Sequence, residues 1–302
     1  MLLRRRFSFL TIILLLSVAS SSPFAGNTAA VLSTEQKLAA LERASGGKLG
    51  VSAVDTGSGK RIRYRADERF LFASTFKVIL VAAILRQSES DSALPEKKIT
   101  YTTEDLVDWS PITEKHIAEG MTVFDLCAAT LQYSDNTATN LLIHELGGPQ
   151  QLTLFAHSIG IHAFSLDDRE PELNANSGKA GDTRNTASPA AMETGLARLA
   201  LGDILAVPQR VQLQRWLKGN ITGDQSIRAG IPDGWVVGDK TGSSDKSGLS
   251  NDIAVIWPPD GEPWILAIFY TQQQKPASVR KNTLAQATRL VVEALTQESP
   301  PL

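Results

Sequence analysis

Hydrophobic positions follow two different spacings along this chain. Near both ends they occur in short runs with turn residues between them, which is typical of β-strands. Between these ends, residues 76–85 are hydrophobic on nearly every side of a helix, as in a helix buried within a large core. Residues 163–187 are polar and show no sustained period, which predicts a long functional loop. The predicted strands are residues 48–55, 61–65, 234–240, 252–257 and 264–271.

Local signals predict where the first and last helices begin. Ser33 followed three residues later by Gln36 is a capping box, and it predicts a helix that continues to about Ser45. Near the other end of the chain, Asn282 or Thr283 is expected to cap a terminal amphipathic helix. Both helices lie next to predicted strands, so we expect them to cover a sheet.

These elements predict an α/β (α+β) fold in which an antiparallel sheet is flanked by helices. An all-helical lobe, residues 67–214, is expected as an insertion. Residues 26–66 and 215–302 would then form one discontinuous α/β lobe. An omega-like loop is expected at about residues 165–183, and the active site is expected between the two lobes.

The N-terminus is typical of an export signal. Arg4 to Arg6 precede an apolar run, residues 7–19, and small residues follow it. We therefore expect residues 1–25 to be removed and the protein to be secreted to the periplasm. A membrane anchor is the alternative, but the run is shorter than the ~20 residues that span a bilayer.

Composition narrows the classes of function. The chain has 302 residues, 42% of them hydrophobic and 21% charged, as a compact globular protein does. A net charge of −2 favours neither nucleic acid nor an anionic membrane as a partner. Cys127 is the only cysteine and has small apolar neighbours, so we expect it to be buried. The four histidines have no metal-ligand spacing, and we expect no metal and no cofactor.

Ser74 and Lys77 are the first candidate pair for chemistry, because residues three apart share one side of a helix. A catalytic serine needs a neighbour that accepts its proton, and a lysine in a dry site can lose its charge and do so. The same spacing occurs twice elsewhere, but only Ser74 begins the wholly hydrophobic helix. The alternative is a capping serine followed by a lysine whose ammonium group reaches solvent.

Two tripeptides add polar groups. Ser134 and Asn136 belong to a Ser-Asp-Asn sequence between two helices, where the alternative role is a helix cap. Lys240 and Thr241 belong to a Lys-Thr-Gly sequence at the end of a predicted strand. A cation and a hydroxyl placed there can hold a carboxylate, and the glycine lets a ligand approach the backbone.

Glu170 and Asn174 lie in the irregular segment. A carboxylate held in a loop, with an amide four residues later, could bind and activate a water molecule. The alternative is a solvated acidic turn. Each of the four motifs is weak alone, but chance seldom places all of them in one chain, each at a helix start, a loop or a strand end.

With these motifs in this order, the sequence resembles the class A serine β-lactamases over about residues 30–297. The resemblance implies a monomeric enzyme that hydrolyses penicillins and cephalosporins through a serine acyl-enzyme and confers antibiotic resistance, with an extended spectrum as a hypothesis. It implies β-lactams as substrates and water as the only co-reactant. From the net charge and the absence of a further apolar run, we expect no nucleic-acid partner, and no membrane partner after signal removal. A penicillin-binding D,D-peptidase or a β-lactam sensor domain is the alternative, and Glu170 argues against both.

The resemblance also implies catalytic roles. Ser74 would attack the β-lactam carbonyl with Lys77 beside it, and Ser134 would pass a proton to the departing nitrogen. Glu170, with Asn174, would position and deprotonate the water that hydrolyses the acyl-enzyme. Either Lys77 or Glu170 would activate Ser74, and the sequence does not decide between them.

Substrate-binding roles follow in the same way. Asn136 would hold the side-chain amide of the substrate, and Lys240 with Thr241 its carboxylate. The backbone N–H groups of the nucleophile and of Ser243 would form the oxyanion hole, and the Ser243 side chain could also contact the carboxylate. Trp109 resembles an aromatic residue often found at the rim of the pocket.

The chain departs from the common pattern at the carboxylate site. Many members have an arginine on the strand after Lys-Thr-Gly, where this chain has Leu249. We expect Arg280 or Lys281 to supply the missing cation.

It also departs at the loop. An arginine that usually braces this loop is replaced by Asp168, so we expect Arg169 with Asp182 to brace it, or a looser loop.

Overall fold

The computed structural model describes residues 32–175, 181–274 and 276–297; the predicted export signal, residues 1–25, lies outside them. The helices of the described chain are α1 (Thr34–Ser45), α2 (Lys77–Ser88), α3 (Val123–Ala128), α4 (Asn136–Leu146), α5 (Pro149–Ser158), α6 (Pro189–Ala200), α7 (Val207–Lys218) and α8 (Ala277–Thr296). The strands are β1 (Lys48–Asp55), β2 (Arg61–Tyr64), β3 (Phe70–Leu71), β4 (Lys98–Ile99), β5 (Met121–Thr122), β6 (Phe164–Ser165), β7 (Thr186–Ala187), β8 (Val236–Ser244), β9 (Leu249–Trp257) and β10 (Trp264–Thr271). Three short turns matter for the site: the 3₁₀ turns η1 (Ala73–Phe76) and η6 (Glu172–Asn174), and the π-helical turn η5 (Ala129–Tyr133).

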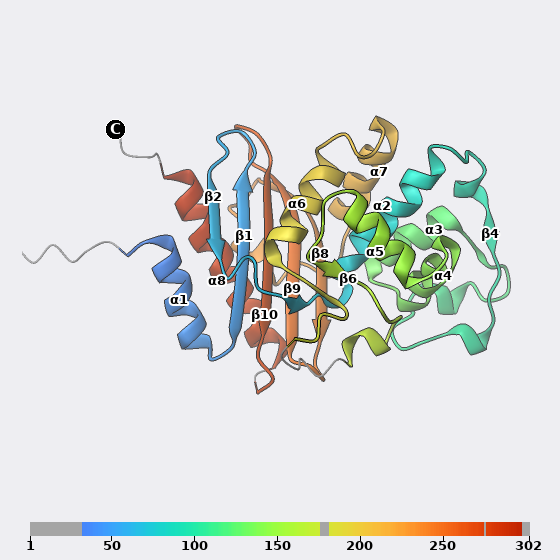
Figure 1. Ribbon diagram of the computed structural model, residues 1–302, viewed down its shortest axis with the longest axis horizontal. Helices are drawn as coiled ribbons and strands as arrows, with labels where there is room; N and C mark the ends of the chain where they lie inside the picture. Colours follow the sequence, from blue (N-terminus) through green and yellow to red (C-terminus); the bar gives the residue numbers. More distant parts are fainter. Residues whose placement is uncertain (1–31, 176–180, 275, 298–302) are drawn as a thin grey trace, which may run out of the picture. The chain divides into compact units, whose positions relative to one another are not determined.

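Five strands form one antiparallel sheet in the order β2-β1-β10-β9-β8. β1 pairs with β10 along its whole length, from Lys48 opposite Thr271 to Asp55 opposite Trp264. Segments from the two ends of the chain therefore lie side by side in the centre of the sheet (Figure 1). β8 has a strand partner on one side only, so its other edge is open to the residues of the site.

Helices cover both faces of the sheet. α1 and α8 pack against each other and against one face, whereas α6 packs on the other (Figure 1). Alternation along β10 serves the two layers, because Phe269 belongs to the hydrophobic cluster on the α6 side and Ile268 to the cluster on the α8 side. The predicted class, an antiparallel sheet flanked by helices, is confirmed. The lobe boundaries remain a prediction.

α2 is the central helix of the larger cluster. Its residues from Lys77 to Leu85 are all buried, as their continuous hydrophobic pattern predicted. Cys127 in α3 is also fully buried, and burial raises the pKa of its thiol. The prediction that this cysteine is a buried hydrophobic residue is therefore confirmed.

Some predicted boundaries are right and others are wrong. Ser33 and Gln36 form the predicted capping box at the start of α1. α8, however, begins at Ala277 with Pro276 at its N-cap, not at Asn282 or Thr283. The first turn of α8 is helical because the buried Arg280 packs it against the sheet, and a proline is tolerated at a helix start.

β8 and β9 are longer at their shared turn than the sequence predicted. β8 continues to Ser244 and β9 begins at Leu249, so Lys240 and Thr241 lie within the strand and not at its end. Polar residues border the cleft here, and they hide the alternation that would mark a strand.

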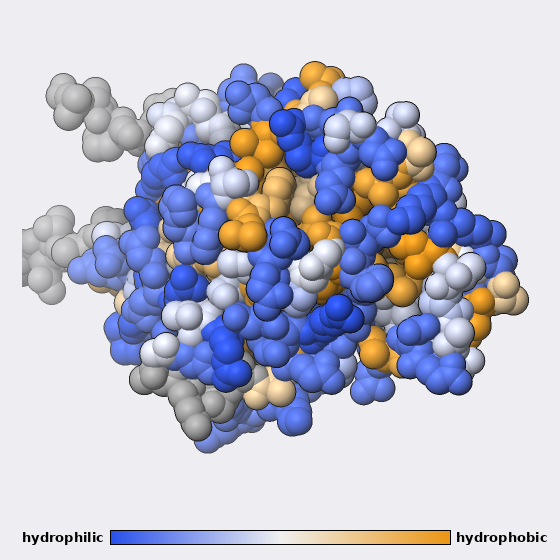
Figure 2. All heavy atoms as spheres, turned by 45° about the vertical axis from the view of Figure 1, so that its right-hand side comes forward, coloured by the Kyte–Doolittle hydropathy of each residue, from blue (hydrophilic) through white to orange (hydrophobic). Residues whose placement is uncertain are grey.

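The surface is mainly polar. The face shown in Figure 2 is covered mostly by hydrophilic side chains, with hydrophobic side chains in smaller groups. Trp109 is the most exposed large hydrophobic residue of the described chain, at 64%. Of the helices in the described residues, none combines the length and the apolar character that crossing a bilayer requires.

Candidate active site

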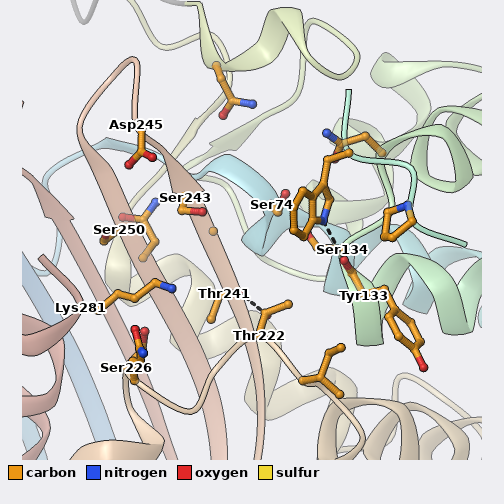
Figure 3. Close-up of a pocket in the computed structure, with 18 of the residues that line it drawn as sticks. Ser74, Tyr133, Ser134, Thr222, Ser226, Thr241, Ser243, Asp245, Ser250 and Lys281 are labelled. Atoms are coloured by element: carbon orange, nitrogen blue, oxygen red, sulfur yellow. Dashed lines mark hydrogen bonds between the residues drawn. The ribbon is translucent and has the colours of Figure 1, made fainter. Parts of the chain in front are cut away.

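A cleft of about 860 Å³ lies beside β8 (Figure 3). It is bordered by residues from η1, η5, α4, η6, β8 and α8. Among the residues singled out from the sequence, its lining includes Ser74, Trp109, Ser134, Asn136, Glu170, Asn174, Thr241, Ser243 and Lys281. The structure therefore brings together residues that lie more than 200 positions apart in the chain.

Ser74 lies in η1, the turn that leads into α2. Its Oγ donates a hydrogen bond to Oε1 of Glu170 at 3.3 Å. The backbone of β8 approaches this turn closely: a Cβ on Gly242 would lie 2.7 Å from the Phe72 main-chain oxygen and 3.0 Å from the Ser74 nitrogen. Only glycine permits this contact, which sets the Ser74 amide beside the strand that carries Ser243.

Lys77 is fully buried behind the nucleophile. Its Nζ donates to the Ser134 main-chain oxygen at 2.9 Å and to Oδ1 of Asn136 at 2.6 Å, and it lies 3.4 Å from Oε1 of Glu170. Burial lowers the pKa of Lys77, while the nearby Glu170 carboxylate acts in the opposite direction. The Lys77 Nζ is therefore shielded from solvent and lies within 3.4 Å of these three oxygen acceptors.

Ser134 follows η5 and lies between two lysines. Its Oγ accepts from Nζ of Lys240 at 3.1 Å and from Nζ of Lys77 at 3.4 Å. Burial, followed by the charge on Lys77, lowers the pKa of Lys240 to about 7. Ser134 and two other non-glycine residues beside the cleft, Ala73 and Trp109, have a positive φ of 60°, 46° and 66°. Such conformations cost energy and are typical of functional sites.

The middle residue of the Ser-Asp-Asn sequence has a structural role. Asp135 caps α4 by accepting from the Ala138 amide, and it also accepts from the amide and the hydroxyl of Thr113. The capping interpretation of the tripeptide is thus correct for Asp135, while the residues on either side of it face the cleft. Asn136 donates from Nδ2 to the Asp108 main-chain oxygen at 2.8 Å.

Glu170 is 2% exposed and is held from three directions. Its Oε2 accepts from Nδ2 of Asn174 at 3.0 Å. The side chain of Asn140 bonds to both the main-chain nitrogen and the main-chain oxygen of Glu170, at 3.0 and 2.8 Å. The sequence analysis missed Asn140, although it lies four residues after Asn136, on the same side of α4.

The base of the Glu170 loop is held differently from our expectation. Asp182 forms its ion pair with Arg184 at 2.7 Å, so the predicted pairing with Arg169 is wrong. Asp168 instead accepts from Nδ2 of Asn185 at 2.8 Å. Asn185 is fully buried at φ 55°, and its Oδ1 accepts from two backbone amides of the loop. The buried side-chain amide of Asn185, and not the predicted ion pair, therefore braces the base of the loop.

Two cations from α8 lie near β8, but only one borders the cleft. Lys281 is in the cleft lining, and its side chain points toward Thr241 (Figure 3). Arg280 is 2% exposed; it pairs with Asp245 and donates to Oγ of Ser250. Thr222, which the sequence analysis also missed, shares a hydrogen bond with the Thr241 hydroxyl.

Trp109 lies at the rim of the cleft, where its indole Nε1 donates to the Tyr133 main-chain oxygen at 3.0 Å. Ser243 follows Gly242 on β8 and is exposed to the cleft. The polar groups thus form a chain of contacts, each within 3.4 Å of the next, in the order Ser74, Glu170, Lys77, Ser134 and Lys240. This combination of groups suits nucleophilic acyl transfer followed by hydrolysis.

Comparison with known proteins points to the same chemistry. Residues 33–295 match the model of the Beta-lactamase enzyme family. The chain is 51% identical to Beta-lactamase OXY-2 of Klebsiella oxytoca, over 96% of this chain and 98% of the relative. It is 50% identical to Beta-lactamase Toho-1 of Escherichia coli, over 95% and 97%.

Solved structures agree. The chain matches a class A β-lactamase described as the last common ancestor of Gram-negative bacteria, with a TM-score of 0.83, 50% identity, and coverage of 87% of this chain and 99% of that one. It also matches a β-lactamase from Desulfarculus baarsii with a TM-score of 0.83 and 48% identity, over 88% and 98%. The chain therefore belongs to the β-lactamase enzyme family, and within that family to the class A serine enzymes.

Proposed function

We propose that this enzyme opens the β-lactam ring of penicillins and cephalosporins through an acyl-enzyme on Ser74 and then hydrolyses that ester with a water activated by Glu170. The observation that carries the proposal is the placement of the Glu170 carboxylate between Ser74 and Asn174, at 3.3 and 3.0 Å. A group in this position can serve both halves of the reaction, because it reaches the nucleophile and the space beside it.

In the acylation step, Ser74 Oγ attacks the ring carbonyl, and the oxygen that becomes negative is stabilised by the backbone N–H groups of Ser74 and Ser243. One such donor contributes about 3–4 kcal/mol to transition-state stabilisation. The contacts favour Glu170 as the base, since it accepts the hydrogen of Ser74 in the free enzyme. Lys77 supports this step by holding Glu170 and Ser134 in place.

Ser134 then delivers a proton to the ring nitrogen as the C–N bond breaks. Its hydroxyl lies between the ammonium groups of Lys77 and Lys240. A hydroxyl that accepts from two cations has its own hydrogen free to point toward the substrate, and either lysine can replace the proton that it gives away.

The substrate carboxylate binds to Lys240, Thr241 and Lys281. We assign the cation that is missing at Leu249 to Lys281, since it borders the cleft whereas Arg280 is buried against Asp245. The Ser243 hydroxyl, two residues after Thr241 on β8, is placed to help bind this carboxylate.

At the amide of the substrate side chain, Asn136 uses the second hydrogen of its Nδ2. The first hydrogen is bonded to Asp108.

Deacylation needs one water molecule between Glu170 and the acyl-enzyme. The buried Oδ1 of Asn174 has no hydrogen-bond partner among the described residues. A buried acceptor without a partner is costly, so it marks a place where a water would be held. The same carboxylate–amide pair is the feature that argues against a D,D-peptidase or a sensor domain.

We further propose that residues 1–25 export the enzyme to the periplasm, where it acts as a monomer that protects the cell from β-lactams. Trp109 would cover the substrate at the rim. Ser243 and Ser244 beside Asp245 are compatible with hydrolysis of oxyimino-cephalosporins. Similar kcat/KM values for benzylpenicillin and cefotaxime would support that spectrum, and no detectable cefotaxime turnover would remove it.

The assignment of Glu170 can be tested on intact protein. Glu170→Ala should acylate more slowly but still accumulate a stable penicilloyl adduct, because deacylation loses the group that activates its water. Mass spectrometry would show this adduct as protein plus one benzylpenicillin. Ser74→Ala should form no adduct, which controls for the site of attachment. A Glu170→Ala variant that hydrolyses benzylpenicillin as fast as the wild type would show that another group activates the water.

A further inference from the structure

One side-chain hydrogen bond joins two walls of the cleft. Ser247, in the turn between β8 and β9, donates from its Oγ to the main-chain oxygen of Asn174 at 2.6 Å. Asn174 ends η6, in the loop that carries Glu170. The bond therefore links the end of the sheet to the loop, and none of the roles proposed above uses it.

The turn at this end of the sheet is fixed independently of the loop. Asp245 pairs with Arg280 on α8. The main-chain oxygen of Gly248 accepts from the Gln272 amide at 2.8 Å. Gly248 has φ 65°, and a Cβ there would lie 2.6 Å from the Cα of Gln273, so the turn packs directly on the chain that follows β10.

Among the described residues, the hydrogen bonds of Asn174 other than that from Ser247 stay within the loop. Its amide N–H bonds to the main-chain oxygen of Pro171 at 3.2 Å, which is a contact within the same short turn. Its side chain bonds to Glu170, also within the loop. Ser247 supplies the hydrogen bond that ties the Asn174 main chain to the sheet. If this bond is lost, we expect the loop end to move and the turn to stay in place, because the turn is fixed by its contacts with α8 and with the residues after β10.

Under the proposed function, this bond lies near the end of the cleft that would hold the acylamino group of the substrate. If the carboxylate binds near Thr241 and Lys281 and the ring carbonyl lies at Ser74, the acylamino group must leave in the other direction along β8. Asp245 lies at that other end, away from Ser226 and Lys281 (Figure 3).

We propose that Ser247 is a specificity-determining residue. Its hydrogen bond to Asn174 holds the loop close to β8 and limits the size of the acylamino group that the cleft accepts. The residue does not contact the reacting atoms, so it acts through the distance between the two walls.

The test compares a bulky and a small side chain on the same variants. Ser247→Ala removes the hydroxyl and should raise the ratio of kcat/KM for ceftazidime to kcat/KM for benzylpenicillin about two- to tenfold, the factor expected from one net hydrogen bond. Lys246→Ala changes the exposed neighbour on the same turn and should leave the ratio as it is. A purely structural role would lower both kcat/KM values by the same factor, so the ratio would stay constant.

A second pair of variants covers the case in which alanine disturbs the turn. Ser247→Thr and Ser247→Val have nearly the same shape, but only the first keeps the hydroxyl. We expect the higher ceftazidime preference for Ser247→Val and a ratio near that of the wild type for Ser247→Thr. Equal ratios in this pair, with benzylpenicillin still hydrolysed, would overturn the role of Ser247 alone. A wild-type protein that hydrolyses no β-lactam would overturn the proposed function as well.

Discussion

Exchanging the amide of Asn185 for a carboxylate disturbs the base of the Glu170 loop with almost no change in size. Asn185 connects two parts of the site: its side chain bonds to Asp167 and Asp168, shortly before Glu170, and its main-chain oxygen accepts from the Phe72 amide at 3.3 Å, shortly before Ser74. In Asn185→Asp, the two backbone amides keep their acceptor. The 2.8 Å bond from Nδ2 to the Asp168 carboxylate becomes a contact between two like charges.

The cost can be estimated from that one contact. A hydrogen bond to a charged group contributes about 1.5–3 kcal/mol, and the new repulsion in a buried place adds to the loss. We expect Asn185→Asp to lower the free energy of unfolding by about 3 kcal/mol at pH 7.5, or roughly 6–12 °C in Tm. The loss should shrink toward pH 5, because a proton shared by the two carboxylates restores a donor. Deacylation should slow more than acylation, since it also needs Glu170 and Asn174 to hold the hydrolytic water.

The matched rescue is Asp168→Asn combined with Asn185→Asp, which reverses the direction of the same bond. Thermal and urea unfolding would measure the stability of both single variants and of the double variant. Mass spectrometry of quenched-flow samples would follow the formation and decay of the acyl-enzyme. We expect the double variant to recover at least half of the lost stability and the deacylation rate. A double variant that is no better than Asn185→Asp, or a single variant within about 1 kcal/mol of the wild type, would refute the reasoning.

Three further predictions concern the strand and its cations. Because the pKa of Lys240 is lowered to about 7, its charge is lost as pH rises through that value. In a pH–rate profile, kcat/KM should therefore fall on the alkaline side. Lys240→Arg should move that fall to higher pH. In steady-state kinetics, Lys281→Ala should raise KM for benzylpenicillin about fivefold and change kcat by less than about twofold. Lys281→Arg should stay close to the wild type. An unchanged KM for Lys281→Ala would mean that this cation does not bind the carboxylate. Gly242→Ala should lower the free energy of unfolding by about 1–3 kcal/mol and nitrocefin turnover by more than about tenfold, since its Cβ would meet the Phe72 and Ser74 backbone; normal turnover would contradict the need for this close approach.

Much of the fold was predictable from local signals. The capping box at Ser33 and the hydrophobic run of α2 depend on neighbouring residues only, and both predictions are confirmed. The start of α8 and the ends of β8 and β9 were missed, because they depend on contacts with distant parts of the chain. Arg280 is an example: its sequence neighbours say nothing of its burial against Ser250.

The site shows the same division. The sequence analysis found the residues to which we assign the chemistry, since their motifs are short and contiguous. Ser74, Ser134 and Glu170 line one cleft, and Lys77 and Lys240 bond to Ser134. It missed Asn140, Thr222 and Asn185, each a single polar residue whose partner lies far away along the chain. The Arg169–Asp182 prediction failed for a related reason. Opposite charges near the same loop do not meet unless the backbone brings them together.

Cys127 has a consequence for how the protein can be made. Because the chain has a single cysteine and its thiol is buried in α3, native folding requires no disulfide and exposes no thiol to oxidants. The mature chain can therefore reach the same active form in a reducing cytosol as in an oxidising compartment. Reductants and thiol reagents in an assay should leave its turnover unchanged.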